Sequence, residues 1–225
     1  MTRPLLVLRP EPGASATAAT AERLGLAPVR APLFAVRAVD WEPPETLPDA
    51  LLLTSVHAVR WAGPELAKLM TLPVYTVGEA TARAARGAGF ARVIAGDAGV
   101  DALVERARAD GIGRWLHLAG REHRRPAPPP MTETRIVYAA DAAERLPETA
   151  EAALPGAVAL LHSPRAAGLY RRLAEEAGFP PASLAVAAIS PAAAEAAGEG
   201  WRALAVAERP NDAALLAAAA KLCDQ

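Results

Sequence analysis

The sequence predicts an α/β protein made of two similar lobes with parallel sheets, and two observations carry this prediction. Short apolar runs alternate with alanine-rich helical segments of about ten residues, which is typical of parallel strands joined by right-handed crossovers. The chain also repeats itself, because residues 51–104 read like residues 159–216. The copies begin about 110 residues apart, which is a domain-sized spacing rather than a solenoid period. We therefore expect two lobes with a ligand cleft between them.

The first half of the chain divides at proline and glycine residues. Residues 5–8 form a buried strand that ends at Arg9-Pro10, and a helix follows over residues 15–24. Residues 29–39 are then extended. The first repeat predicts strands and helices in alternation: strand 50–53, helices 56–61 and 65–70, strand 74–77, helix 79–88, strand 92–95 and helix 101–109.

The second half follows the same rules. Residues 114–118 form a strand that runs into the next loop. Residues 122–133 cannot form a helix, because their prolines remove N–H donors and clash with the preceding turn. Residues 135–140 are again extended. The second repeat predicts strands at 158–161, 185–189 and 203–206, with helices between them.

The segments outside the repeat also match each other, so the order along the chain is A, B, A, B. Each A segment is a strand, an arginine-bearing loop and a second extended strand. If each lobe needs one A and one B, the chain could close in two ways. The lobes could follow each other in series, or the middle B and A could form one lobe and leave the first A to complete the last B. In the second arrangement, residues 33–39 and 135–140 would be linker strands.

Composition excludes several classes of protein. The 225 residues are 52% hydrophobic, which is ample for a core, and the net charge of −1 gives no field that favours nucleic acid or an anionic membrane. Cys223 is the only cysteine, which argues against a disulfide framework or a cysteine metal cluster. The apolar run at the N-terminus is too short for a signal peptide or a membrane span. We expect a cytosolic monomer without a metal, a cofactor, or a nucleic-acid or membrane partner.

Four turns at the carboxyl ends of predicted strands open helices, and ligands bind at this edge of open α/β sheets. A helix N-terminus offers free N–H groups and positive potential to an anion. Capping alone also explains Ser and Thr at such positions, and Pro commonly starts a helix. Both interpretations stay open for the four turns, which are Thr54-Ser55, Gly78 to Thr81, Ser163-Pro164 and Ser190-Pro191.

A basic cluster consists of Arg121, His123, Arg124 and Arg125. These side chains could be solvated, as charge runs usually are. Alternatively, they could bind a polycarboxylate, because arginine pairs with carboxylates bidentately. Arg9 occupies the matching loop of the first A segment.

Tyr138 lies in an extended segment, where a tyrosine is more often packed than catalytic. The four histidines lack metal-ligand spacing, and the chain has no phosphate-binding glycine loop, dinucleotide fingerprint or nucleophile elbow. The residues by themselves indicate two lobes, a cleft and anion-binding helix ends without a cofactor signature.

The chain resembles the uroporphyrinogen-III synthase family over nearly its whole length. No single motif is specific, and the resemblance rests on an ordered set of segments. The set is VLRPEP near the start, LLLTSVHAV at 51–59, VYTVGEATARAARGAGF at 74–90, LHLAGREHRR at 116–125, IVYAA at 136–140, LLHSPRAA at 160–167, ISPAAAEAA at 189–197 and AERPNDAALL at 207–216.

The resemblance implies the second arrangement. Residues 1–34 with 143–225 would form one α/β lobe, residues 39–133 would form an inserted lobe, and residues 35–38 and 134–142 would be linker strands. It also implies the reaction. Hydroxymethylbilane, a linear tetrapyrrole with eight carboxylates, loses its hydroxyl group and closes to uroporphyrinogen III, with the last pyrrole ring inverted through a spiro intermediate. Neither a metal nor a cofactor takes part, and a transient contact with the upstream deaminase is expected. The alternative is a two-lobed tetrapyrrole-binding module without catalysis.

By the same resemblance, Tyr138 assists departure of the hydroxyl group, and several of the turn residues line the cleft. The loops and the resemblance together give the candidate substrate-binding residues Arg9, Thr54, Ser55, His57, Gly78, Thr81, Gly120, Arg121, Arg124, Ser163 and Ser190. The chain departs from the family pattern in three places: His57 stands where Asn is common, Ala192 and Ala193 replace hydroxyl side chains, and the PAPPP segment at 126–130 replaces a helix.

Overall fold

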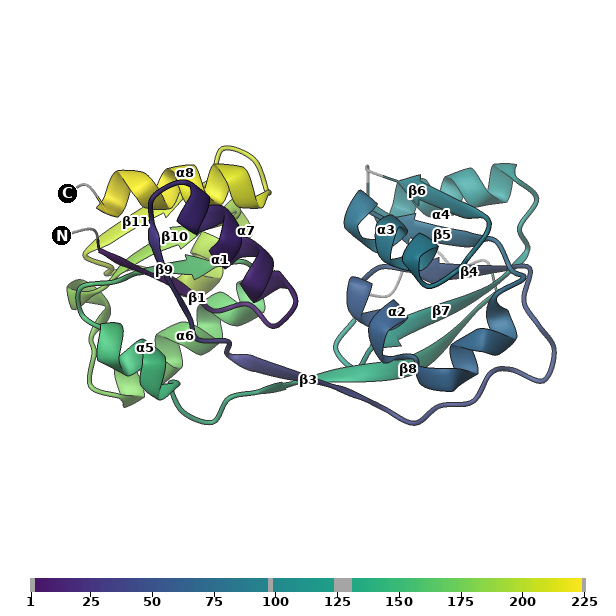
Figure 1. Cartoon of the computed structure of the whole chain (residues 1–225), viewed down its shortest axis with the longest axis horizontal. Coiled ribbons are helices and arrows are strands. Elements are labelled where there is room, and N and C mark those ends of the chain that lie inside the picture. Colours follow the sequence, from purple (N-terminus) through teal and green to yellow (C-terminus); the bar gives the residue numbers. More distant parts are fainter. Residues whose placement is uncertain (1–2, 97–98, 124–130, 224–225) are drawn as a thin grey trace. The chain divides into compact units, whose positions relative to one another are not determined.

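A computed structural model describes residues 3–96, 99–123 and 131–223 of the chain. By their contacts the residues form two compact units (Figure 1). The first unit is Met1–Ala35 with Asp141–Gln225, and the second unit is Val36–Ala140.

The first unit contains a five-stranded sheet with its N-terminal strand inside it. β1 (Pro4–Val7) lies between β2 (Ala27–Arg30) and β9 (Val158–Leu161), and all three strands are parallel. β10 (Ala185–Ala188) and β11 (Ala203–Val206) continue the sheet beyond β9, also in parallel. A continuous apolar run forms β1 because both faces of a parallel strand are covered.

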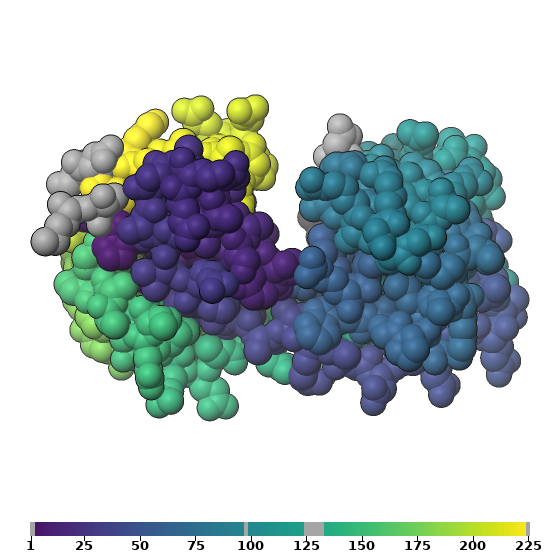
Figure 2. Space-filling view, in the orientation of Figure 1, coloured from purple at the N-terminus to yellow at the C-terminus, as the bar shows by residue number. Residues whose placement is uncertain are grey.

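Helices cover both faces of this sheet. α1 (Gly13–Arg23) and α8 (Asp212–Cys223) share one core cluster with the strands, and α6 (Pro164–Glu176) packs against α7 (Pro191–Ala197). α5 (Glu148–Ala153) lies with α6 on the side of the sheet opposite α1 and α8 (Figure 1). In the space-filling view the purple N-terminal segment adjoins the yellow C-terminal segment on the surface of this unit (Figure 2).

The second unit contains a six-stranded sheet in the order β3-β8-β7-β4-β5-β6. The paired strands from β8 to β6 are all parallel to their neighbours. The bounds of the strands are β3 (Phe34–Ala38), β4 (Ala50–Leu53), β5 (Val74–Val77), β6 (Val93–Gly96), β7 (Arg114–Gly120) and β8 (Met131–Ala142).

Two clusters of buried apolar side chains lie between this second sheet and the helices that cover it. One lies under α2 (Val56–Trp61), the 3-10 helix at Gly63–Leu69 and α3 (Glu79–Gly87). The other lies under α4 (Val100–Ala109), where the ring of Tyr75 meets Trp115 edge-on. The chain passes between the two units twice, once within β3 and once within β8.

The expected mixed α/β fold with parallel sheets is confirmed. β7 and β8 are longer than predicted, because pairing with each other extends both strands beyond their apolar centres. α5 was not predicted from the sequence. The proline-rich segment expected to be non-helical lies mostly outside the described residues, and its end, from Met131, belongs to β8.

Candidate functional site

Chemistry-bearing residues gather at the carboxyl edge of the second unit's sheet. The sheet order places the ends of β8, β7, β4 and β5 next to one another. Thr54 and Ser55 directly follow β4, Gly78 follows β5, and Gly120 ends β7. The edge is therefore assembled from segments far apart in the sequence.

The turn after β4 uses its two hydroxyl groups differently. Ser55 is the N-cap of α2, and its Oγ accepts a hydrogen bond from the N–H of His57 at 3.2 Å. Thr54 Oγ1 lies 3.2 Å from Nε2 of His117. The sequence-predicted cap is thus present at Ser55, whereas Thr54 bonds to a neighbouring strand and stays half-buried at the edge.

Tyr138 lies against Gly120 and His57. An irregularity in the pairing of β7 with β8 sets Gly120 opposite Tyr138, and the Arg121 N–H donates to the Tyr138 carbonyl at 2.9 Å. A Cβ on Gly120 would lie only 2.5 Å from Cζ and 2.8 Å from the hydroxyl oxygen of Tyr138. The ring of His57 is 5.5 Å from that of Tyr138, centroid to centroid. Only a glycine leaves room for the phenol in this place.

Two further histidines lie close to this group. The ring of His117, fully buried in β7, is 5.5 Å from that of His123, edge to face. His123 Nδ1 in turn lies 2.9 Å from the carbonyl oxygen of Gly120. Burial lowers the pKa of His117 to about 4, and the charge of His123 acts in the same direction. The sequence interpretation missed His117, although a histidine in the middle of the apolar strand WLHLAG was a signal.

The turn after β5 depends on its glycine. Gly78 has φ of +78°, a conformation that a side chain disfavours, and it precedes the first residue of α3. Thr81 lies in the first turn of α3, with a side chain only 4% exposed. This turn therefore presents backbone N–H groups to the edge rather than the Thr81 hydroxyl.

In the first unit Arg9 belongs to a charged cluster around Asp212, the first residue of α8. Arg9 Nη1 donates to both carboxylate oxygens of Asp212, at 2.9 and 3.1 Å, and the Thr17 hydroxyl donates to one of them at 2.6 Å. His162 Nε2 lies 3.4 Å from the other carboxylate oxygen, Oδ1 of Asp212. Burial would raise the pKa of Asp212, but His162, Thr17 and Arg9 together lower it to about 2. Arg9 is thus already paired with an internal carboxylate.

Ser163 and Ser190, the two candidate substrate-binding serines of this unit, act as helix caps. Ser163 Oγ accepts from the N–H of Ala166 at 3.1 Å, and Ser190 Oγ accepts from the N–H of Ala193 at 3.3 Å. Arg121, in the second unit, is exposed. Arg124 lies outside the described residues.

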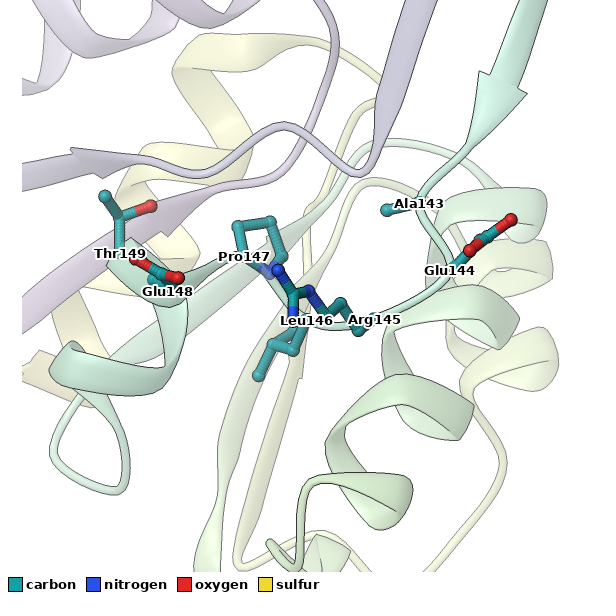
Figure 3. Close-up of a pocket in the computed structure, with 7 residues that line it drawn as sticks. All are labelled: Ala143, Glu144, Arg145, Leu146, Pro147, Glu148 and Thr149. Carbon is teal, nitrogen blue, oxygen red and sulfur yellow. The ribbon is translucent and has the colours of Figure 1, made fainter.

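A shallow depression on the first unit lies between β8 and α5 (Figure 3). None of the predicted site residues lines it. Its two glutamates suit an anionic ligand poorly. The lining is Ala143, Glu144, Arg145, Leu146, Pro147, Glu148 and Thr149.

Fold and residues together define the class of protein. In each unit, helices begin at the carboxyl edge of an open sheet of mainly parallel strands, and this class of protein binds small ligands at that edge. Within the described ranges, no His, Cys, Asp or Glu residues form a group that could hold a metal ion. None of the described helices is long and apolar enough to cross a membrane.

Comparison with known proteins identifies the family. The family model "Uroporphyrinogen-III synthase HemD" matches residues 15–217. The chain belongs to the uroporphyrinogen-III synthase family. It is accordingly an enzyme of tetrapyrrole biosynthesis, a cyclising lyase.

One solved structure supports the fold, and a second is similar over its whole length. A uroporphyrinogen-III synthetase from Helicobacter pylori is 18% identical, with a TM-score of 0.67 and coverage of 99% of this chain and 100% of its own. A mutant uroporphyrinogen III synthase from the extremely thermophilic bacterium Thermus thermophilus is 17% identical over the full length of both chains, with a TM-score of 0.49. No curated protein sequence matches the chain.

Proposed function

We propose that this chain converts hydroxymethylbilane to uroporphyrinogen III with the carboxyl edge of the second unit's sheet as its reacting surface. The observation that carries the proposal is the packing of Tyr138 on Gly120 and beside His57, which lies in the first turn of α2. A polar group held in a fixed position at a ligand-binding edge suits a reaction that depends mainly on orientation.

Tyr138 assists the departure of the substrate hydroxyl group. A phenol is an O–H donor, and transfer of its proton to the departing oxygen lets the C–O bond break with loss of water. The phenolate takes a proton back when the pyrrole carbon loses its hydrogen on final ring closure. The remaining azafulvene-like cation is attacked by the substituted carbon of the last pyrrole ring, which gives the spiro intermediate. Reopening and reclosure of that ring then produce the inverted isomer. A polar edge that excludes water stabilises the cation during these steps.

Backbone N–H groups and arginines bind the substrate carboxylates. The Oγ atoms of Ser55, Ser163 and Ser190 cap their own helices, which leaves peptide N–H groups of those helix starts as the donors for anions. The start of α3 at Gly78 to Thr81 offers the same donors. The exposed Arg121 adds a positive charge at the end of β7.

Substrate binding also depends on the two lobes. In this proposal, residues 1–34 with 143–225 and residues 39–133 act as lobes that the strands 35–38 and 134–142 connect. Movement of lobes on two strands would admit a large linear tetrapyrrole and release the ring. The protein acts as a cytosolic monomer that makes a transient contact with the upstream deaminase.

The test is product analysis. Purified protein, treated with chelator, is supplied with hydroxymethylbilane, and the oxidised products are separated by chromatography. We expect the type III isomer to dominate, whereas a protein-free control gives the uninverted isomer. A product mixture equal to that control would reject the proposed activity, and ligand binding without a change in isomer ratio would favour the non-catalytic binding module.

A further inference from the structure

A histidine that the proposed reaction does not use lies next to the site. His117 is fully buried in β7, and its Nε2 is 3.2 Å from Thr54 Oγ1. No described residue gives its Nδ1 a hydrogen-bond partner. A buried imidazole in which only one nitrogen has a hydrogen-bond partner is uncommon, because a buried polar atom without a partner costs free energy.

The ring is neutral at physiological pH. Burial lowers the pKa of His117 to about 4, with His123 acting in the same direction. A neutral imidazole carries one N–H and one lone pair. The proton is therefore on Nδ1 or on Nε2, and the two tautomers give Thr54 opposite roles.

The surroundings favour the proton on Nε2. A proton on Nδ1 would leave a buried N–H donor without an acceptor, which is rarer in folded proteins than an under-used acceptor. With the proton on Nε2, Nδ1 is an acceptor whose lone pair has no donor, and Nε2–H donates to Thr54 Oγ1.

This tautomer decides which way the Thr54 hydroxyl points. An oxygen that accepts from Nε2–H must direct its own hydrogen elsewhere. Thr54 is half-buried and directly precedes the N-cap of α2 at the carboxyl edge of the sheet. We propose that His117 is a positioning residue that fixes the Thr54 hydroxyl as a hydrogen-bond donor to a substrate carboxylate. This inference rests on the proposed function.

The kinetic test compares variants that keep or remove the donor. His117→Gln places an amide N–H near the position of Nε2, and His117→Met keeps the approximate volume without a donor. We expect His117→Met to raise KM for hydroxymethylbilane roughly 10-fold with kcat within about twofold, and His117→Gln to restore most of the loss, because a hydrogen bond to a charged group is lost and regained. In a Thr54→Val background, His117→Met should add little further increase, because both changes remove the same interaction.

Thr76→Val is the matched control. Thr76 is also fully buried, on strand β5 of the same sheet, and its hydroxyl donates to the carbonyl oxygen of Ile94 at 3.4 Å. We expect its KM to stay at the wild-type value. If His117→Met raises KM by the same factor in the presence and absence of Thr54, or leaves KM unchanged, His117 only fills space and the inference is wrong.

A second measurement is made on the wild-type protein and does not depend on catalysis. A long-range ¹H–¹⁵N NMR spectrum of the wild-type protein labelled at histidine distinguishes the protonated nitrogen from the bare one, with His117→Gln used for assignment. Nε2–H is expected, and Nδ1–H would overturn the inference. Failure of the proposed function shows separately, as a wild-type protein that yields no excess of the type III isomer.

Discussion

The carboxylate of Asp212 is expected to stabilise the first unit in a pH-dependent way. The pKa of this group falls from 3.8 to about 2, and one pKa unit corresponds to about 1.4 kcal/mol, so the shift alone corresponds to roughly 2–3 kcal/mol. Because the side chain is 33% exposed, solvent screening reduces this value, and we expect about 1–2 kcal/mol. Asp212→Asn should lower the free energy of unfolding by that amount at pH 7.

The direction of the pH dependence follows from linkage. A carboxyl group whose pKa is lower in the folded state stabilises the folded protein. The stabilisation is complete above the unfolded pKa near 4 and is lost as the pH falls towards the folded pKa of about 2. Urea unfolding at pH 7, 5, 4 and 3 should therefore show a difference between wild type and Asp212→Asn that is constant down to about pH 5 and shrinks below pH 4.

Asp101→Asn is the matched control, because Asp101 holds the corresponding position near the start of α4 but is exposed. We expect it to change the free energy of unfolding by less than about 0.5 kcal/mol. An Asp212→Asn protein as stable as wild type at pH 7, or a difference that persists unchanged to pH 3, would refute the reasoning. The cluster with Arg9 would then contribute no net stability.

Three further predictions concern catalysis and domain structure. Tyr138→Phe should fold normally and lose roughly 10-fold in kcat, since the phenol assists an easy leaving step. Gly120→Ala should also lower kcat by roughly 10-fold, because its Cβ would displace the Tyr138 ring, whereas Gly87→Ala, with no atom within 4 Å of its Cβ, should not. A fragment of residues 36–140 should unfold cooperatively on its own, whereas a fragment of residues 1–112 should not.

Steady-state kinetics with isomer analysis tests the two active-site variants, and denaturant titration followed by circular dichroism tests the fragments. Wild-type kcat and isomer ratio in Tyr138→Phe would make the tyrosine a packing residue. Equal kcat in the two alanine variants would show that the Tyr138 ring tolerates displacement. Cooperative unfolding of 1–112 together with an unfolded 36–140 would reverse the division into lobes.

The local sequence was sufficient to predict most elements of the fold. The predicted bounds of β4, α2, β5, β9 and β11 agree with the structure. Each of these elements is a short apolar or alanine-rich run bounded by a cap or breaker such as Ser55 or Gly63. These signals act over a few residues, so the sequence alone reports them. The ordered set of segments also predicted the family, and the family match confirms it.

The contacts of the site depended on tertiary structure. His117 reaches Thr54 across 63 residues of sequence, and Arg9 reaches Asp212 across 203. The pairing of β7 with β8 sets Gly120 against Tyr138, which made a predicted substrate-binding glycine the neighbour of a predicted catalytic residue. Strand order and register determine which residues far apart in the sequence come into contact, and both depend on how the whole chain packs. Hence the sequence alone predicted candidate residues for the site but not His117, and the fold decided which of them meet.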